Sequence, residues 1–267
     1  MPDGIEYMWK EDGAVGSSLR PGAVVISSFP SAGLATTVAG HYMIRALKLP
    51  RIARFDSPDL APVAVVQGGE VHPTVRVYGR DDLALVLSEF PPTPPQANAI
   101  AHTILEGAET RHARMVICLE GIVPHPGEED GEDAVEGSSD GQVWAAYSQT
   151  DPPLRALFQG AKARTLEDGV IGGVSGALLV QGIGKKIPVV TLLVSARVAE
   201  GLPDHRAGAA LIETLDRVLP ELRIDTEPLR HQAEQIERAL RTALKAHTGG
   251  AERGPPGSPA PSADMYR

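Results

Sequence analysis

The sequence predicts an α/β fold: a three-layer α/β/α sandwich in which helices cover both faces of a mainly parallel sheet. Short runs of continuous apolar, β-branched residues, typical of buried strands, alternate with segments whose apolar residues have helical spacing. No linker-like stretch interrupts this alternation between residues 22 and 246. We therefore expect one domain at 22–246, a leading segment at 1–21 and a flexible tail at 247–267.

The first half of the chain contains one clear strand–helix unit followed by several short strands. Residues 1–21 are polar with several glycines, so we expect a weak hairpin or loop there. A buried strand at 23–27 precedes a helix that Pro50 closes. Four strands then follow without helices between them, which favours antiparallel hairpins inserted into the sheet. Their expected positions are residues 51–55, 63–66, 74–78 and 83–87.

Helices and strands alternate again in the second half. A proline cluster at 91–95 opens a helix with its inner face at 97–108, and a buried strand follows at 115–119. Residues 124–141 are acidic and rich in glycine and proline, so we expect a solvated loop. The remaining elements are expected as a strand at 143–147, helices at 153–160 and 177–181, a strand at 188–194, and helices at 204–219 and 227–245.

The last predicted helix carries a narrow apolar seam. Its members have the 4-3-4-3 spacing that suits packing against another helix, and they are Leu229, Ala233, Ile236, Leu240 and Ala243. Because the partner helix can come from a second subunit, we expect a homo-oligomer.

Composition excludes several functional classes. The formal net charge is −9, which argues against a general binder of nucleic acid or of anionic membranes. Aromatic residues make up only 4%, too few for base-stacking platforms. Cys118 is the one cysteine, and we find no signal-peptide pattern and no apolar run long enough to span a membrane. We expect a soluble cytoplasmic protein.

Three carboxylates close predicted strands and precede turns: Asp56, Glu89 and Glu120. Ligands of open α/β sheets bind at the carboxyl ends of strands. Converging carboxylates would hold a hard cation or act as acid and base. The competing interpretation is that each one caps a turn or pairs with an arginine, and we favour it because no spacing rule links the three.

A glycine-rich run, Gly172-Gly173-Val174-Ser175-Gly176, lies between a predicted strand and a predicted helix. Its backbone N–H groups suit an anion, but it matches neither a phosphate loop nor a dinucleotide fingerprint. Ser175 would need a glycine where Ala177 stands to form a nucleophile elbow. Asp204 and His205 are the remaining members of a conceivable triad. We favour a tight turn and expect Ser175 not to be a nucleophile.

Metal and cofactor sites have no support in the sequence. No two histidines have the His-x-x-x-His spacing, and Cys118 stands alone. We therefore expect no metal ligands, no cofactor and no catalytic residues.

The C-terminal end is the sequence feature that most specifically indicates a binding function. A Gly- and Pro-rich stretch that cannot bury a core ends in Met265, Tyr266 and Arg267. The tyrosine offers a rigid ring and a hydroxyl, the methionine an adaptable apolar anchor, and the terminal carboxylate a charge. These three residues form a candidate partner-binding element, although three residues also match many tails by chance.

Six segments in order resemble the archaeal branch of the proteasome assembly chaperone family. The resemblance covers about residues 22–245, with Ser31 standing where relatives often have glycine. The segments are Ser28-Phe29-Pro30-Ser31-Ala32-Gly33-Leu34, Asp56-Ser57-Pro58-Asp59-Leu60-Ala61-Pro62-Val63-Ala64, Ser88-Glu89-Phe90-Pro91, Leu119-Glu120-Gly121-Ile122, residues 172–178 and Leu202-Pro203-Asp204.

This resemblance implies a three-layer α/β/α fold that oligomerises and binds the proteasome α-subunit ring. Some archaeal members end in a hydrophobic–Tyr–any-residue tail, which Met265, Tyr266 and Arg267 match one for one. The leading hypothesis is a non-enzymatic chaperone or adaptor that docks such tails into pockets of the ring. The alternative is a small-molecule enzyme, of ligase or hydrolase type, that uses the strand-end carboxylates and the turn Gly172 to Gly176.

Overall fold

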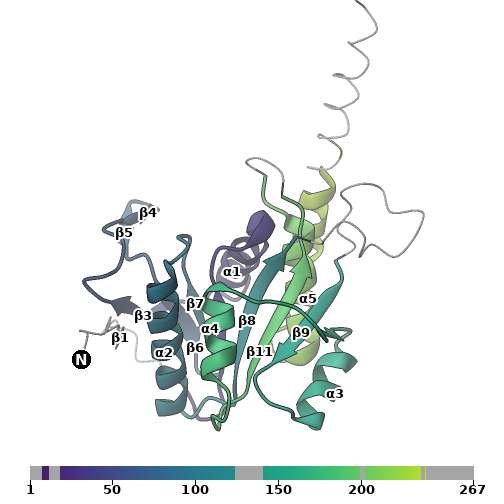
Figure 1. The fold of residues 1–267 in the computed structure, drawn as a ribbon. Helices are drawn as coiled ribbons and strands as arrows, with labels where there is room; N and C mark the ends of the chain where they lie inside the picture. Colours follow the sequence, from purple (N-terminus) through teal and green to yellow (C-terminus); the bar gives the residue numbers. More distant parts are fainter. Residues whose placement is uncertain (1–7, 12–18, 124–140, 199–201, 236–237, 239–267) are drawn as a thin grey trace, which may run out of the picture.

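The computed structural model describes residues 8–11, 19–123, 141–198, 202–235 and 238. A sheet of nine strands forms the middle of the molecule (Figure 1). In spatial order its strands are β1 (Met8–Glu11), β3 (Arg51–Asp56), β6 (Arg76–Arg80), β7 (Leu83–Leu87), β2 (Val24–Ser28), β8 (Met115–Ile122), β11 (Val189–Ser195), β9 (Val143–Tyr147) and β10 (Arg164–Thr165).

The centre of the sheet is parallel, as the sequence predicts. β2 pairs in parallel with β7 and β8, and β8 pairs in parallel with β11. Every residue of β2, β7 and β11 is buried, which is why their sequences are continuous apolar runs rather than alternating ones. Antiparallel pairings lie on both flanks, between β7, β6, β3 and β1 on one side and between β11 and β9 on the other.

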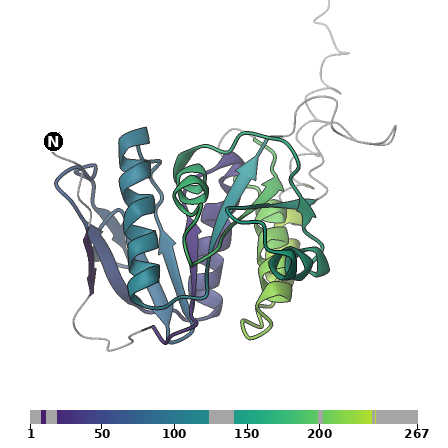
Figure 2. The same ribbon diagram turned by 60° about the horizontal axis from the view of Figure 1, so that its bottom comes forward.

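Helices cover both faces of this sheet, which confirms the three-layer sandwich. α2 (Pro94–Thr110) and α4 (Gly173–Gln181) pack together on one face, and α1 (Ala35–Ala46) and α5 (His205–Val218) on the other (Figures 1 and 2). Because successive side chains of a strand point to opposite faces of the sheet, the apolar core has two parts, one on each face. In β8, Ile117 and Leu119 join the core under α1 and α5, whereas Val116 and Cys118 join the core under α2 and α4. α3 (Pro152–Gly160) lies beside β9 (Figure 1) and contacts β10 and α5.

Two predictions for the first half were wrong in detail. Part of the leading segment is an ordered edge strand, because β1 pairs antiparallel with β3. The strand expected at 63–66 is β4 (Val65–Gln67), which pairs with β5 (Glu70–His72) in a separate two-stranded sheet instead of entering the main one. Gly68 and Gly69 form the turn between β4 and β5, both with positive φ, but the short polar strand β5 has no apolar pattern to predict it.

The second half follows the prediction except at the glycine-rich run. β10 ends at Thr165, so no strand directly precedes Gly172, and α4 begins at Gly173 rather than at Ala177. The run is therefore the first turn of a helix. Residues 227–235 are helical, and their seam residues Leu229 and Ala233 are buried within this same chain.

Several expectations fall outside the described residues. These are most of the acidic loop at 124–141, the seam residues Ile236, Leu240 and Ala243, and the whole tail with Met265, Tyr266 and Arg267. In the part of the chain that is described, no helix is long and apolar enough to cross a membrane.

Candidate functional site

The segments that carry the family resemblance meet at the carboxyl edge of the parallel strands. The turn after β2 contacts the end of β8, where the Gly121 N–H donates a 2.9 Å hydrogen bond to Ser31 Oγ. A Cβ at Gly121 would overlap the Ala32 carbonyl, so glycine is required for this approach. Segments that are distant in the sequence therefore form one contiguous surface.

A second contact joins the same turn to the start of α5. Gly33 has a φ of +62°, and a Cβ there would lie 2.6 Å from the Arg197 carbonyl oxygen. The Asp204 N–H donates to the Gly33 carbonyl at 2.7 Å, while Asp204 Oδ1 caps α5 by accepting from the Ala207 N–H at 3.0 Å. These two motif residues therefore hold the turn and the helix together.

A pocket of about 300 Å³ opens between the ends of β2 and β8 and the first turn of α4. Its walls are mostly apolar, with Phe29, Pro30 and Ile171 among them. Glu120 and Ser175 also line it, and the Ser175 hydroxyl donates a 2.7 Å hydrogen bond to Glu120 Oε2. Glu120 points to this face because it follows Val116 and Cys118 at the two-residue period of the strand.

The carboxyl of Glu120 has an unusual acidity. Burial raises the pKa of Glu120 to about 7, although the hydrogen bond from Ser175 opposes that rise. The chain leaving β2 turns towards β7, whereas the chain leaving β8 turns towards β11. Ligands of open α/β sheets bind at such a switch point. A perturbed carboxyl in a pocket at this place marks a candidate small-molecule site.

The other two strand-end carboxylates do not join Glu120. Asp56 forms an ion pair with Lys10 of β1, and the hydrogen bond from Lys10 lowers the pKa of Asp56. Glu89 forms an ion pair with the fully buried Arg76 and lies 2.9 Å from His41 Nε2. Burial would raise the pKa of Glu89, but His41 and Arg76 together hold it below its usual range. Asp56 and Glu89 therefore have the structural role of pairing with cations.

No histidine is recorded in hydrogen-bond contact with Ser175 in the described parts of the chain, where its hydroxyl donates to Glu120 instead. His205 Nδ1 lies 3.0 Å from the Pro203 carbonyl oxygen, and Asp204 is engaged in capping α5. The Cys118 thiol is fully buried, and burial raises its pKa to about 12, so it is not a reactive thiolate. The described ranges also contain no cluster of three or more potential metal ligands.

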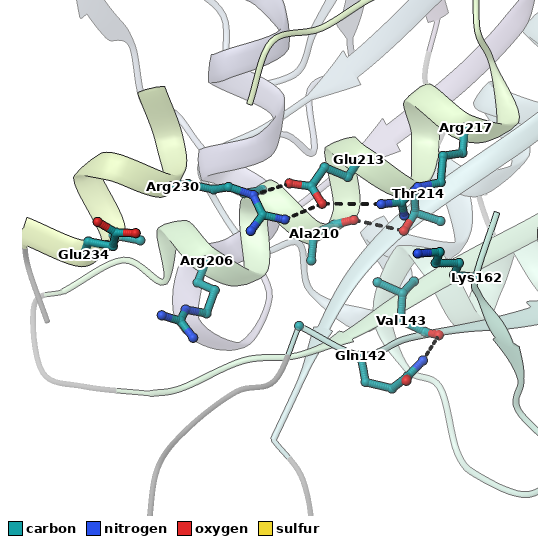
Figure 3. Close-up of a pocket in the computed structure, with 13 residues that line it drawn as sticks. Gln142, Val143, Lys162, Arg206, Ala210, Glu213, Thr214, Arg217, Arg230 and Glu234 are labelled. Atoms are coloured by element: carbon teal, nitrogen blue, oxygen red, sulfur yellow. Dashed lines mark hydrogen bonds and ion pairs between the residues drawn. The ribbon is translucent and has the colours of Figure 1, made fainter. Parts of the chain in front are cut away.

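A second pocket, of about 390 Å³, lies where the helical residues 227–235 meet α5 (Figure 3). Arg230 forms two hydrogen bonds of 2.6 Å with the Glu213 carboxylate, and Arg217 lies 3.6 Å from the same carboxylate. The Arg230 hydrogen bonds, together with Thr226 Oγ1 donating to Glu213 at 3.0 Å, fasten the last described helix to α5, whereas the Arg217 contact lies within α5. The sequence analysis missed this charged face. The i, i+4 spacing of Glu213 and Arg217 is a signal that could have found those two residues, whereas nothing in the sequence marks Arg230 as their partner.

Comparisons with known proteins identify the family to which the chain belongs. The sequence model of the PAC2 family matches residues 25–244. A protein of Methanocaldococcus jannaschii described as uncharacterized is 26% identical over 226 residues, which are 84% of this chain and 86% of that protein.

Solved structures with a similar fold include two proteins of Pyrococcus furiosus. Pyrococcus furiosus PbaA, described as an archaeal homolog of proteasome-assembly chaperone, is 25% identical, with a TM-score of 0.70 over 89% of this chain and 98% of PbaA. Pyrococcus furiosus PbaB, described as an archaeal proteasome activator, shares the fold at 20% identity, with a TM-score of 0.72 over 90% of this chain and 99% of PbaB. Since the family model spans most of its length, the chain belongs to the PAC2 family.

Proposed function

We propose that this protein is a non-enzymatic, cytoplasmic chaperone or adaptor of the proteasome. It acts as a homo-oligomer that docks its C-terminal hydrophobic–Tyr–X tails into pockets of the proteasome α-subunit ring, and so assists assembly or regulates the core particle. The observation that carries the proposal is the sequence Met265-Tyr266-Arg267 at the C-terminal end. Membership of the PAC2 family and the descriptions of PbaA and PbaB support it.

The helical residues 227–235, which precede the tail in the sequence, are packed firmly against the rest of the domain. Leu229 is 2% exposed and packs into the core under α1 and α5. The Tyr42 hydroxyl donates a 2.6 Å hydrogen bond to the Asp225 carbonyl, and Arg230 pairs with Glu213. The helix that leads towards the tail is therefore fixed at its start by both apolar and polar contacts.

The length of the tail suits docking without rigid alignment. As a flexible chain, which its Gly- and Pro-rich composition predicts, a segment of the 17 residues 248–264 would span about 23 Å on a root-mean-square basis. A single three-residue element buries little surface and binds weakly, whereas several tails on one oligomer multiply the avidity. The homo-oligomer is thus part of the proposal, and light scattering that finds a monomer at micromolar concentration would contradict it.

Deletion of residues 265–267 tests the proposal. The truncated protein should keep its circular dichroism spectrum and melting temperature but fail to bind isolated α-subunit rings in a pull-down. Glu120→Gln is the matched control, because it alters the switch-point pocket and leaves the tail intact, so ring binding should be unchanged. Truncated protein that binds the rings as well as the full chain would refute tail docking.

The alternative is a small-molecule enzyme that uses the Glu120 pocket. What favours it is the pKa of about 7 for a carboxyl at a switch point, a value suited to general acid–base work. Of the groups that the sequence suggested, the structure brings only Glu120 and Ser175 together. A turnover of any small carbonyl or anionic substrate that Glu120→Gln abolishes and the tail deletion leaves intact would establish this alternative.

A further inference from the structure

A third pocket, of about 310 Å³, lies at the far end of the sheet between β9, α3, β10 and α4. Arg155 and Tyr147 line it, with Thr165 beside them. It has only Ile171 in common with the Glu120 pocket, and none of its lining residues lies in the helical residues 227–235.

Arg155 has no carboxylate partner there. Across the described ranges the structure records no hydrogen bond and no ion pair for its guanidinium, and Nε is buried without a partner. Its charge lies instead over the Tyr147 ring, 5.5 Å from the centroid. An arginine in a pocket normally forks onto a carboxylate or a phosphate. The buried Nε–H of this half-buried arginine is therefore left without an acceptor among the described residues.

Tyr147 presents a second unused donor. Its hydroxyl oxygen is buried, and the Thr165 hydroxyl beside it can donate to that oxygen, but no acceptor is recorded for the Tyr147 proton among the described residues. Burial raises the pKa of Tyr147, so the phenol stays protonated and can donate. The Tyr147 ring also makes an edge-to-face contact with Phe158, at a centroid distance of 6.0 Å. A buried polar group left without a partner is costly, and two in one pocket indicate that a ligand completes them.

The rest of the lining indicates the chemical class of that ligand. Leu166, Ile171 and Leu179 form apolar walls, which suit an aliphatic body. The carboxylates of Glu167 and Asp168 also line the pocket and disfavour a multiply charged anion such as a phosphate ester. A single negative charge at one end of an apolar molecule satisfies both conditions.

We propose that this pocket binds a small aliphatic monocarboxylate, whose carboxylate accepts hydrogen bonds from the Arg155 guanidinium and the Tyr147 hydroxyl. The aliphatic body lies against Leu166, Ile171 and Leu179. The proposal is independent of tail docking, because none of these residues belongs to the tail or to the helix that leads to it.

The test is titration of the full-length protein with 4-methylpentanoate, followed by calorimetry and by ligand-observed NMR. We expect saturable binding at millimolar concentration or below, and binding of the neutral 4-methylpentanamide at least about tenfold weaker, because the amide lacks the charge. Absence of saturable binding of the acid, or equal binding of acid and amide, would overturn the proposal.

Variants assign the binding to the pocket. Arg155→Met keeps much of the side-chain volume and should weaken binding of the acid by about tenfold or more, and Tyr147→Phe by about three- to tenfold. Arg155→Lys keeps the positive charge but loses the two parallel N–H donors of the guanidinium, so its affinity for the acid should lie between those of the native protein and Arg155→Met. It also covers the case in which Arg155→Met does not fold. The matched control is Arg164→Met on neighbouring β10, which is exposed and does not line the pocket. If Arg164→Met weakens binding as much as Arg155→Lys, or if Arg155→Lys binds like the native protein, the assignment is wrong.

Discussion

The Ser175 hydroxyl donates a 2.7 Å hydrogen bond to the Glu120 carboxyl across the carboxyl edge of the sheet. Because the pKa of Glu120 is about 7 in the folded protein, against an ordinary value of 4.5, folding retains a proton that unfolding releases between these pH values. Stability contributed by this group is therefore present below about pH 4.5 and lost as the pH rises through 7.

Glu120→Gln should remove this dependence. The amide still accepts from Ser175 but carries no charge, so the variant should be more stable than the native protein by about 3 kcal/mol at about pH 8. The difference should shrink as the pH falls towards 5. Urea unfolding at both pH values measures it. A variant less stable than the native protein at the higher pH would show that the buried carboxylate is better solvated than its contacts indicate.

Glu89 neutralises a fully buried arginine. Arg76 is 0% exposed, so Glu89→Gln leaves a buried cation without its carboxylate and should cost about 3 kcal/mol of unfolding free energy. Since the folded pKa of Glu89 is lowered, this stabilisation is present above about pH 4.5 and is lost as the pH falls through the folded value.

Chemical denaturation at neutral and acidic pH tests the Glu89 prediction. The native protein and Glu89→Gln should converge in stability at low pH. Asp56→Asn is the control, because Asp56 pairs with an exposed lysine at the sheet edge and its loss should shift the midpoint far less. Equal effects of the two substitutions would mean that burial of Arg76 has no energetic consequence.

Leu229 holds the helix that leads towards the tail. Leu229→Ala removes a side chain that is 2% exposed, and large-to-small substitutions in cores cost about 2–5 kcal/mol. Because Leu229 lies in the last described helix, its loss should open that helix locally. We expect residues 226–235 of the variant to exchange their amide hydrogens faster than in the native protein, while β2 and β8 keep their protection. Uniformly faster exchange would instead mean that this helix and the sheet open together.

The spacing of apolar residues predicted the parallel sheet, and the strand-end carboxylates predicted part of the Glu120 pocket. Residues 23–26 form a continuous apolar run because both faces of β2 are covered, and this pattern is readable without a structure. The position of Glu120 near a strand end was also readable, although β8 runs on to Ile122 and Glu120 lies within it instead of closing it. Its hydrogen bond with Ser175 was not, because it joins residues 55 positions apart and depends on where α4 packs.

The partners of the other carboxylates could not be predicted for the same reason. Asp56 meets Lys10 because β1 adds to the edge of the sheet, and β1 is too short and polar to be recognised. The unpaired donors of Arg155 and Tyr147 become visible only when burial and hydrogen bonding are known atom by atom. Periodicity identifies elements, whereas side-chain pairing is decided by tertiary contacts.

Tyr266 should dominate binding to the proteasome ring. If its ring fills an apolar cleft, Tyr266→Ala should cost about 2 kcal/mol or more per tail, as for a buried aromatic hot spot. Arg267→Ala should cost far less, because that residue contributes mainly its backbone carboxylate. Equilibrium binding of both variants to isolated α-subunit rings compares them. Equal losses would assign the side chain of Arg267 a role that the proposal does not give it.

Adding one residue after Arg267 tests the central proposal most directly. The extension keeps Met265, Tyr266 and Arg267 but moves the terminal carboxylate away from the tyrosine. Surface plasmon resonance on immobilised α-subunit rings should show a loss of affinity as large as that of Tyr266→Ala. An extended chain that binds as tightly as the native one would contradict docking through the C-terminal carboxylate.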